Sequence, residues 1–369
     1  MYMPRLSPGA TIGILGNGQL GRMLCLAAAP LGYRTHVYGP EDNSPASQVA
    51  TVSTVASYDD KGALAAFADA VDVVTFEFEN VPADAASFLA DHTTVRPTWR
   101  ALEIAQDRTL EKKFFAEIGA KTPAWRGVNS SAELRKAVGE IGLPAILKTT
   151  RLGYDGKGQV KLKAAEDVEN AWHSLTGGKD VSSNGAFAVL ESMVDFNCEV
   201  SVIAARDESG TVICFEPSEN VHANHMLATS TVPARIDAVT AKTVTGIARR
   251  AAEALEMVGL LAVEMFVTKN GEVLCNEMAP RPHNSGHWTM DACGTSQFTQ
   301  LIRAVAGLPL ADPMRHSDVK MTNLVGEDVN KLDSYLADPA AHLHLYGKRE
   351  ARPGRKMGHV NVLSPKTGE

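Results

Sequence analysis

The sequence predicts a mixed α/β and α+β protein in three parts: an N-terminal domain with a parallel sheet, a larger central region with antiparallel hairpins, and a small C-terminal unit. Strand and helix patterns alternate up to about Thr98, which is typical of a parallel sheet covered by helices. Beyond residue 120, strand candidates follow one another through glycine-rich turns. Because 369 residues are too many for one hydrophobic core, we expect two or three domains.

Composition and charge narrow the class of protein. The chain has 44% hydrophobic and 21% charged residues, as an ordinary soluble enzyme does. Its net charge of −7 argues against a general nucleic-acid binder. No apolar run is long enough to span a bilayer, and the first ten residues lack the apolar core of a signal peptide, so we expect no membrane association. The five cysteines are scattered without a C-x-x-C pair, which favours the reducing cytoplasm.

The N-terminal region alternates short apolar runs with helical repeats. The run TIGIL at 11–15 has the character of a buried strand, and apolar residues then recur at helical spacing from Leu20 to Ala27. Further along, the pattern predicts strands at 34–38 and 71–78 and helices at 61–70 and 81–89.

The loop after the first strand reads GNGQLG and has the spacing G-x-G-x-x-G. Such a loop lets backbone N–H groups and a helix N-terminus approach an anion, as in dinucleotide-binding domains. Glu41 and Asp42 stand roughly where that function requires an acidic residue. Many α/β domains use the same turn only for tight strand–helix packing, so both interpretations stay open on these residues.

The central and C-terminal regions have a different pattern. Residues 101–118 predict one continuous helix, which Gly119 and Pro123 end. A helix with Phe298 and Val305 on its apolar face comes late in the chain, before a C-terminal unit rich in His, Arg and Lys. Between these helices lie the strand candidates 144–149, 159–163, 186–190, 199–205 and 211–215, and a hairpin at 261–279.

The hairpin brings two carboxylates together. Asn270-Gly271 favours a two-residue turn, which pairs Glu264 with Glu277 and Lys269 with Glu272. Directly opposed residues share a face with Cβ atoms about 5 Å apart, so two like charges there need a shared proton or a cation between them. A solvated face is the alternative. The apolar residues around Glu264 indicate a buried hairpin, which favours a divalent metal such as Mg²⁺.

A second candidate site lies around Lys148. This lysine stands in the apolar strand PAILKT, where its ammonium needs an anionic partner. The following loop carries Gly153, Gly156 and Gly158, but Gln159-Val160 stands where a Walker loop needs Lys and Ser or Thr. We therefore predict a strand–loop–strand lid over a polyphosphate, with a plain glycine hairpin as the alternative.

Lys148, the GYDGKG lid and the Glu264 and Asn276-Glu277 pair, in that order, resemble the ATP-grasp superfamily. Its members hold ATP between two α+β subdomains and join a carboxylate to a nucleophile through an acyl phosphate. Further motifs are similar to those of the N5-carboxyaminoimidazole ribonucleotide synthetases, the ATPase subunits of phosphoribosylaminoimidazole carboxylase. These motifs span nearly the whole chain and read GNGQLGRM, FEFENV, QDR, GYDGKGQ, APRPHNSGHW and PGRKMGH.

The resemblance implies a domain layout. It consists of a Rossmann-like (pre-ATP-grasp) domain at 1–106 that binds no NAD, an ATP-grasp domain at 107–302 with a lid subdomain at about 122–188, and a C-terminal substrate-site domain at 303–369. The chain departs from the superfamily pattern N-E-x-N-x-R, because Ala279 replaces the later Asn. The metal ligands that the resemblance supports are therefore Glu264 and Glu277, for Mg²⁺ or in its place Mn²⁺.

The resemblance also implies a set of ATP ligands. Arg108 and Lys148 would pair with phosphates, the lid would close over them, and residues 191–194 would present backbone groups to adenine. Glu199 would bind the ribose, and His222 would contact the nucleotide. The full set is Arg108, Lys148, Gly153, Tyr154, Asp155, Gly156, Lys157, Gly158, Gln159, Glu191, Ser192, Met193, Val194, Glu199, His222, Asn276 and Glu277.

A third set of candidate residues concerns the acceptor substrate. Arg281 lies between two prolines that stiffen its backbone, and polar residues follow at once, which indicates a binding site. The alternative is a structural turn whose polar groups are hydrogen-bonded within the protein. The basic segment 348–356 is a candidate phosphate site, where a solvated charged face is the simpler interpretation. The resemblance implies the catalytic residues Tyr154, Arg281, His283 and Lys356, and the substrate-binding residues Gln19, Leu20, Glu77, Asn284, Lys348 and Arg355.

The implied activity is that of an ATP-dependent carbon–nitrogen ligase in purine biosynthesis. Bicarbonate and ATP would form carboxyphosphate, and the exocyclic amine of 5-aminoimidazole ribonucleotide (AIR) would take up the carboxyl group. The family resemblance also implies a homodimer. Three rivals are another ATP-grasp enzyme, such as a formate-dependent glycinamide ribonucleotide transformylase or a biotin-dependent carboxylase, an NAD-dependent oxidoreductase, and an inactive binding module. HNSGHW and PGRKMGH are the motifs that separate the first of these from the synthetases.

Overall fold

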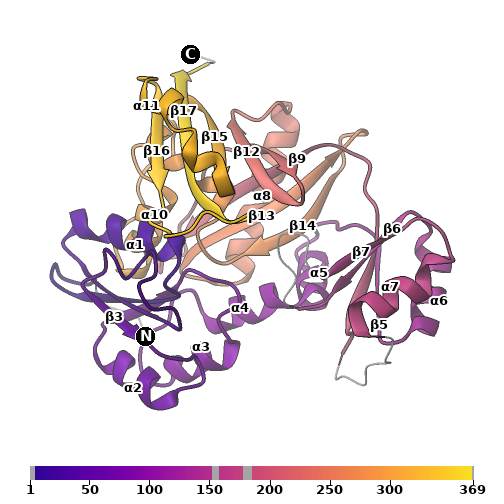
Figure 1. Cartoon of the computed structure of the whole chain (residues 1–369), viewed down its shortest axis with the longest axis horizontal. Coiled ribbons are helices and arrows are strands. Elements are labelled where there is room, and N and C mark those ends of the chain that lie inside the picture. The colour runs from indigo at the N-terminus through magenta and orange to yellow at the C-terminus, as the bar shows by residue number, and fades with distance from the viewer. Residues whose placement is uncertain (1–4, 152–157, 178–184, 368–369) are drawn as a thin grey trace.

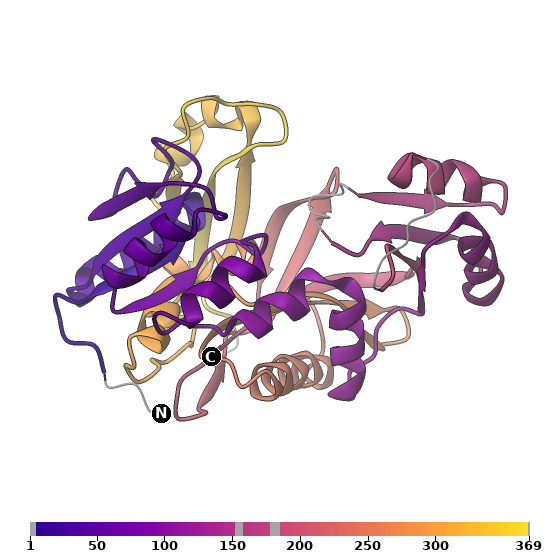
Figure 2. The same ribbon diagram turned by 90° about the horizontal axis from the view of Figure 1, so that it is seen from below.

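Three β-sheets organise the chain in a computed structural model that describes residues 5–151, 158–177 and 185–367 (Figure 1). The N-terminal domain and a small lobe lie at opposite ends of the molecule, with the largest sheet between them (Figure 2). In the described part of the chain, no helix combines the length and apolarity that crossing a bilayer requires.

The N-terminal sheet is parallel, in the order β3-β2-β1-β4. The expected strands and helices are present, although the strand predicted at 71–78 spans only four residues. We did not expect β3, whose sequence VSTV is largely exposed at the sheet edge and therefore lacks the apolar pattern of its neighbours. The elements are β1 (Thr11–Leu15), α1 (Gln19–Ala28), η1 (Ala29–Leu31), β2 (Arg34–Gly39), β3 (Val52–Val55), α2 (Lys61–Asp69), β4 (Val73–Phe76) and α3 (Ala83–Ala90).

The single helix predicted at 101–118 is wrong, because the structure has two. Helix α4 (Trp99–Gln106) ends and α5 (Arg108–Glu117) begins on either side of Asp107. The Asp107 side chain accepts hydrogen bonds from the backbone N–H groups of Thr109 at 2.9 Å and Leu110 at 3.3 Å. An aspartate in this position is an N-cap that starts a new helix, and it fixes where Arg108 emerges.

The small lobe is a four-stranded antiparallel sheet in the order β5-β8-β6-β7, with two helices packed against it (Figure 1). Its core contains Trp172, which is 2% exposed. Strands β6 and β7 are the two that we predicted around the lid loop. The elements are β5 (Trp125–Val128), α6 (Ser131–Ile141), β6 (Ala145–Thr149), β7 (Gln159–Leu162), α7 (Asp167–Thr176) and β8 (Ala188–Ser192).

The central sheet runs in the order β14-β13-β9-β11-β12-β15-β17-β16, with β10 paired to β9. Its strands are β9 (Phe196–Arg206), β10 (Val212–Cys214), β11 (Ser218–Ala223), β12 (Met226–Val232), β13 (Gly259–Thr268), β14 (Val273–Ala279), β15 (Ser317–Val325), β16 (Ala341–Leu345) and β17 (Lys356–Pro365). The C-terminal strands continue this sheet through the pairing of β12 with β15, whereas we expected a small appended unit. The C-terminal basic segment is thereby held at a fixed distance from the hairpin.

Helices cover the central sheet and connect it to the N-terminal domain. Helix α10 (Gln297–Val305) packs against α1, and both contribute to one buried cluster that includes Leu24, Phe298 and Leu301. The long helix α8 contributes to a second cluster under β9 and β13. The remaining elements are α8 (Ala238–Ala254), η2 (Asn284–Gly286), α9 (Thr289–Ala292), η3 (Gly326–Asn330) and α11 (Asp333–Leu336).

The hairpin β13–β14 confirms the predicted pairing of Glu264 with Glu277 and corrects the turn. Near the turn Val267 pairs with Val273, which is one residue out of the predicted register. The register shifts between Glu264 and Met265, where Asn276 is the extra residue on β14. The predicted pair of Lys269 and Glu272 does not form; Lys269 binds Asp195 at 2.8 Å and Glu272 binds Lys121 at 2.6 Å.

Candidate active site

The glycine loop encloses a carboxylate from the chain itself. Glu77, which follows β4, is 6% exposed and accepts hydrogen bonds from the backbone N–H groups of Gly18 at 2.5 Å and Gly21 at 2.6 Å. A Cβ atom at Gly16 would lie 2.4 Å from Glu77 Cγ, and one at Gly18 would lie 2.8 Å from Glu77 Oε1. Close approach of Glu77 therefore explains these glycines.

The acidic residue expected after the second strand contacts the same loop through its backbone. The backbone carbonyl of Glu41 accepts a hydrogen bond from Asn17 Nδ2 at 2.7 Å. A dinucleotide-binding domain would offer the loop N–H groups to a pyrophosphate and the acidic side chain to a ribose. Here Glu77 takes the N–H groups, and the geometry does not favour the NAD-dependent alternative.

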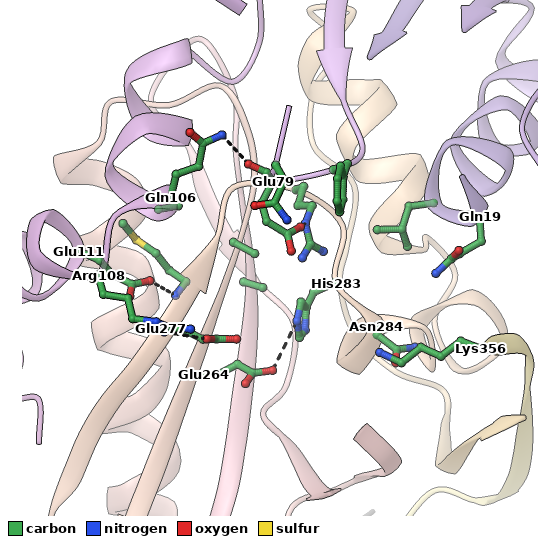
Figure 3. Close-up of a pocket in the computed structure, with 18 of the residues that line it drawn as sticks. Gln19, Glu79, Gln106, Arg108, Glu111, Glu264, Glu277, His283, Asn284 and Lys356 are labelled. Atoms are coloured by element: carbon green, nitrogen blue, oxygen red, sulfur yellow. Dashed lines mark hydrogen bonds and ion pairs between the residues drawn. The ribbon is translucent and has the colours of Figure 1, made fainter. Parts of the chain in front are cut away.

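Two cavities meet at the β13–β14 hairpin. The first, of about 330 Å³, we name the Arg281 cavity (Figure 3). Its lining includes Gln19, Leu20, Phe78, Glu79, Asn80, Gln106, Arg108, Glu111, Glu264, Glu277, Arg281, His283, Asn284, His287 and Lys356.

The second, of about 300 Å³, we name the Lys148 cavity. Arg108, Glu264 and Glu277 line both cavities. The Lys148 cavity has the further lining residues Pro123, Ile146, Lys148, Gln159, Glu191, Ser192, Met193, Val194, Phe196, Glu199, His222, His225, Phe266 and Asn276.

This division matches the two predicted sets of ligands. Every described residue of the predicted ATP set except Gly158 lines the Lys148 cavity. Of the predicted acceptor set, Gln19, Leu20, Arg281, His283, Asn284 and Lys356 line the Arg281 cavity. Glu77, Lys348 and Arg355 are among the lining residues of neither cavity. The predictions for Gly153, Tyr154, Asp155, Gly156 and Lys157 lie outside the described residues.

The bulge in β14 shapes the shared wall. Because Asn276 is the extra residue, both Asn276 and Glu277 reach the Lys148 cavity together with Glu264 from β13. Burial raises the pKa of Glu264 to about 8, and the charge of Glu277 adds to the shift. The neighbouring carboxylate thus disfavours the charged form of Glu264, and a bound cation would offset this repulsion.

The carboxylate pair fits Mg²⁺ by its chemistry. Mg²⁺ prefers oxygen ligands and is commonly held by one or two carboxylates together with substrate phosphates. Among the described residues, no group of three His, Cys, Asp or Glu side chains converges as a metal site. The pair therefore suits a metal that arrives with a nucleotide rather than a metal caged by protein alone.

Helix α5 supports this wall from behind. Arg108 Nη1 lies 3.4 Å from Glu277 Oε2, and Glu111, which is 1% exposed, accepts a hydrogen bond from the backbone N–H of Met278 at 2.6 Å (Figure 3). Burial raises the pKa of Glu111 to about 8, with Glu277 adding to it. Although burial lowers the pKa of Arg108, the charges of Glu277, Glu111 and Glu191 raise it overall. We did not predict Glu111, because an acidic residue in the charged helical segment RTLEKK gives no sign of being buried.

Glu191 joins two lysines at the base of the Lys148 cavity. Its carboxylate oxygens lie 2.8 Å from Lys148 Nζ and 3.0 Å from Lys112 Nζ. Burial raises the pKa of Glu191, but the two ammonium groups outweigh it and lower the pKa to about 2. Lys148 thus has the anionic partner that its strand position required, and Lys112 is a further residue that we did not predict.

At the outer end of the Lys148 cavity, the predicted nucleotide ligands Glu199 and His222 form an ion pair through Glu199 Oε2 and His222 Nδ1. Burial lowers the pKa of His222, but the hydrogen bond and charge of Glu199 raise it overall. Both residues line the cavity together with Phe266 and Asn276.

In the Arg281 cavity, Arg281 binds the carboxylate of Glu79 through Nε, and its Nη1 donates to the carbonyl of Pro282 at 2.8 Å. Gln106 Nε2 donates to the backbone carbonyl of Glu79 at 2.6 Å (Figure 3). It also donates to the backbone carbonyl of Val81 at 2.6 Å. Although burial raises the pKa of Glu79, the Arg281 charge lowers it overall. Arg281 is therefore held by an anionic partner as well as by the stiff backbone that the two prolines predict.

The polar run after Arg281 is anchored on both sides. The side-chain amide of Gln297 joins the backbone N–H and carbonyl of His283 at 2.9 and 2.7 Å. Asn284 and Asn323 exchange side-chain hydrogen bonds at 3.0 and 2.7 Å. Burial lowers the pKa of His283 well below its ordinary value, and Arg281 and Lys356 lower it further. Asn323, buried on β15, is a supporting residue that no sequence signal identified.

The basic segment 348–356 lies against the N-terminal domain. Gln48 Nε2 donates to the carbonyl of Gly347 at 2.9 Å, and Lys348 Nζ donates to the carbonyl of Lys356 at 2.6 Å. Burial and the charge of Arg355 lower the pKa of Lys348 to about 8, while Glu77 and Glu41 are close enough to oppose this shift. A half-buried cluster of cations beside the glycine loop is suited to a phosphate group.

Comparison with known proteins follows the same three parts. Residues 9–106 match the ribonucleotide synthetase preATP-grasp domain, 113–298 the ATP-grasp domain, and 320–369 the phosphoribosylaminoimidazole carboxylase C-terminal domain. The N5-carboxyaminoimidazole ribonucleotide synthase of Brucella melitensis is 52% identical over 364 residues, which is 98% of each chain. The chain belongs to the N5-carboxyaminoimidazole ribonucleotide synthase family. The expected fold class and the expected enzyme class, an ATP-grasp ligase, are confirmed.

Solved structures of the family agree over the whole chain. An ADP complex of an N5-carboxyaminoimidazole ribonucleotide synthetase has a TM-score of 0.93 at 44% identity and covers 98% of this chain and 94% of its own. The Aspergillus clavatus N5-carboxyaminoimidazole synthase, in complex with ADP and 5-aminoimidazole ribonucleotide, has a TM-score of 0.89 at 29% identity, with 97% and 94% covered.

Proposed function

We propose that this enzyme carboxylates the exocyclic amine of AIR in the Arg281 cavity, using ATP and bicarbonate, with ATP held in the Lys148 cavity. The observation that carries the proposal is the wall of Arg108, Glu264 and Glu277, which both cavities share. A nucleotide in one cavity and an acceptor in the other would meet at this wall. Family membership supports ATP-dependent carboxylation of AIR in purine biosynthesis.

The nucleotide side of the reaction is phosphoryl transfer. Bicarbonate attacks the γ-phosphorus of ATP, ADP departs, and carboxyphosphate forms. Lys148 and Arg108 place positive charge beside the transferring group, which stabilises its transition state. Glu264 and Glu277 would hold Mg²⁺, or Mn²⁺ in its place, which neutralises phosphate charge when bound. The lid at 153–159 would exclude water, because carboxyphosphate hydrolyses readily.

The acceptor side is carboxyl transfer to AIR. Arg281, His283 and Lys356 would surround the carboxyl group, and Asn284 would bind AIR. Gln19 and Leu20 at the start of α1 would contact the ribotide, while Lys348 and Arg355 would bind its phosphate. Glu77 would act on AIR through the glycine loop, since its carboxylate fixes the turn that presents Gln19. Tyr154 is proposed for the carboxylation centre on the family resemblance alone.

The proposal includes the oligomeric state and the cellular location of the enzyme. A homodimer and a cytoplasmic location follow from the resemblance and from the scattered cysteines, and no nucleic acid or membrane takes part. Size-exclusion chromatography with light scattering would test the dimer directly.

Phosphate release from ATP, with Mg²⁺ and bicarbonate and with or without AIR, tests the proposed reaction. We expect release that depends on AIR, with label from bicarbonate in an acid-labile product. The variant Arg281→Met should lose this dependence while ATP still protects the protein against thermal unfolding. If AIR gave no stimulation although ATP bound, the acceptor assignment would be wrong, and formate with glycinamide ribonucleotide would be the next pair to test.

A further inference from the structure

His283 is held between two different kinds of neighbour. Its Nε2 atom faces Glu264 Oε1 at 3.4 Å on the cavity side, and its Nδ1 atom faces Ser285 Oγ at 2.8 Å on the protein side. A neutral imidazole has one N–H group and one lone pair. The nitrogen that carries the hydrogen decides whether His283 donates or accepts a hydrogen bond in the Arg281 cavity.

The protein side of His283 continues into a buried polar network. Asn220 is 5% exposed, and its Oδ1 accepts from Ser230 Oγ at 2.8 Å while its Nδ2 donates to Ser201 Oγ at 3.0 Å. Ser201, which is 1% exposed, therefore accepts from Asn220 and donates its own hydrogen to Ser285 Oγ at 2.6 Å. Ser218 Oγ lies 2.9 Å from Ser201 Oγ and has further acceptors in Asn220 Oδ1 and the Ser285 carbonyl, both at 3.4 Å.

The donors and acceptors of this network determine the direction of the hydrogen bond between Ser285 and His283. Because Ser285 Oγ accepts from Ser201, its own hydrogen is available to His283 Nδ1. The backbone N–H of Ser285 also points to Nδ1, at 3.4 Å. Two donors directed at one nitrogen require a lone pair there. The opposite tautomer would leave the fully buried Ser285 N–H facing another N–H, which is unfavourable because a buried donor would then lack an acceptor.

We infer that His283 carries its hydrogen on Nε2 and presents an N–H donor to the Arg281 cavity, with Ser285, Ser201 and Asn220 as the positioning residues that set this tautomer. The inference rests on the proposed function, in which His283 faces the carboxyl group. A donor there binds the anionic carboxyl group and cannot accept the proton of the amine. When the N–C bond forms and the C–O bond to phosphate breaks, the departing phosphate takes that proton.

Nuclear magnetic resonance of the ¹⁵N-histidine-labelled enzyme tests the tautomer without any substrate. The signals of His283 are those absent from His283→Asn, and two-bond ¹H–¹⁵N couplings identify which nitrogen is protonated. We expect an unprotonated Nδ1 and a protonated Nε2. A protonated Nδ1, or an even mixture of tautomers in the wild-type enzyme, would overturn the inference.

Kinetics of Ser285→Ala and Ser285→Cys test the positioning role. Because Ser285→Ala removes the hydroxyl donor, we expect a mixed tautomer and a kcat for AIR carboxylation lower by on the order of tenfold, as for other residues that orient a histidine ring. The KM for ATP should stay unchanged. Because a thiol is a weaker donor than a hydroxyl, the kcat of Ser285→Cys should lie between that of Ser285→Ala and that of the wild type. Ser44→Ala is the matched control, because Ser44 is 2% exposed in the N-terminal domain and lines neither cavity.

The two experiments separate the inference from the proposed function. A mixed tautomer with unchanged kcat in Ser285→Ala would contradict the positioning role. An Nε2–H tautomer in a wild-type enzyme that fails to carboxylate AIR would contradict the proposed function and leave the hydrogen-bond assignment intact.

Discussion

Glu191 shows how much a single carboxylate determines at the residue scale. It is 3% exposed and neutralises two lysines, one of which, Lys112, is 1% exposed. Lys148 faces the cavity in which we place ATP, whereas Lys112 lies behind it. Removing one partner from a buried ion pair leaves an uncompensated charge and typically costs about 3–5 kcal/mol. The position of Lys148 therefore depends on a residue that we had expected to contact adenine.

We predict that Glu191→Gln lowers the free energy of unfolding by about 3–5 kcal/mol at pH 7, measured by urea denaturation. Lys112→Met should lower the free energy of unfolding by less, since Glu191 keeps its ion pair with Lys148. Because the pKa of Glu191 is lowered from 4.5 to about 2 in the folded protein, its contribution is complete above pH 4.5 and declines as the pH falls toward 2. A difference between wild type and variant that stayed constant from pH 7 to pH 3 would contradict this assignment.

Asp107 has the corresponding role at the scale of one element. It ends α4, caps α5 and binds Arg151 Nε at 3.2 Å. We predict that Asp107→Ala destabilises the protein by about 1 kcal/mol through the lost cap and raises the KM for ATP, because Arg108 is the first residue of α5. Asparagine caps helices as well as aspartate does, so Asp107→Asn should retain both properties. Equal KM values for ATP in the alanine variant and the wild type would show that the cap does not position Arg108.

The elements also show which structural features the sequence can predict. The pairing of Glu264 with Glu277 was predicted correctly although the turn was not, because the extra residue Asn276 compensates for a one-residue error at the turn. Bulges and helix caps depend on single polar residues within otherwise continuous patterns, and periodicity does not detect them. The joining of β15 to β12 is a long-range pairing, and no local pattern encodes it.

Only part of the lining of the two cavities is visible in the sequence, for a similar reason. Residues that face a ligand, such as Lys148 and Arg281, form unusual local patterns that a sequence displays. The residues that support them, such as Glu111, Lys112 and Asn323, contact partners far away in the chain and look like ordinary helix or strand positions. Only the folded structure reveals them.

At the scale of the whole molecule, three parts of the chain meet around the Arg281 cavity. The N-terminal domain contributes Gln19 and Leu20, the central sheet contributes Glu264 and Arg281, and the C-terminal strand β17 begins at Lys356. Packing of α1 on α10 and pairing of β12 with β15 fix these parts relative to one another. With these contacts in place, the start of the basic segment lies against the N-terminal domain, where Gln48 donates to the carbonyl of Gly347.

The pH dependence of kcat/KM for AIR tests whether the C-terminal segment contributes to the acceptor site. Because burial and Arg355 lower the pKa of Lys348 to about 8, its ammonium is lost as the pH rises through that value. If Lys348 binds the ribotide phosphate, kcat/KM for AIR, measured at saturating ATP and Mg²⁺ so that Glu264 is already in its metal-binding form, is constant below pH 8 and falls above it by about tenfold per pH unit, whereas kcat/KM for ATP does not follow this curve. Steady-state kinetics from pH 6.5 to about 9.5 measures both.

Two substitutions assign this alkaline fall to Lys348. Lys348→Arg keeps a charge at every pH in this range and should remove the fall, because a guanidinium does not lose its proton there. Lys348→Met should give a low kcat/KM for AIR that does not change with pH. An unchanged fall in Lys348→Arg would mean that another group titrates and that the ribotide phosphate does not depend on this lysine. The two variants together therefore decide whether the C-terminal segment binds the acceptor or only packs against the N-terminal domain.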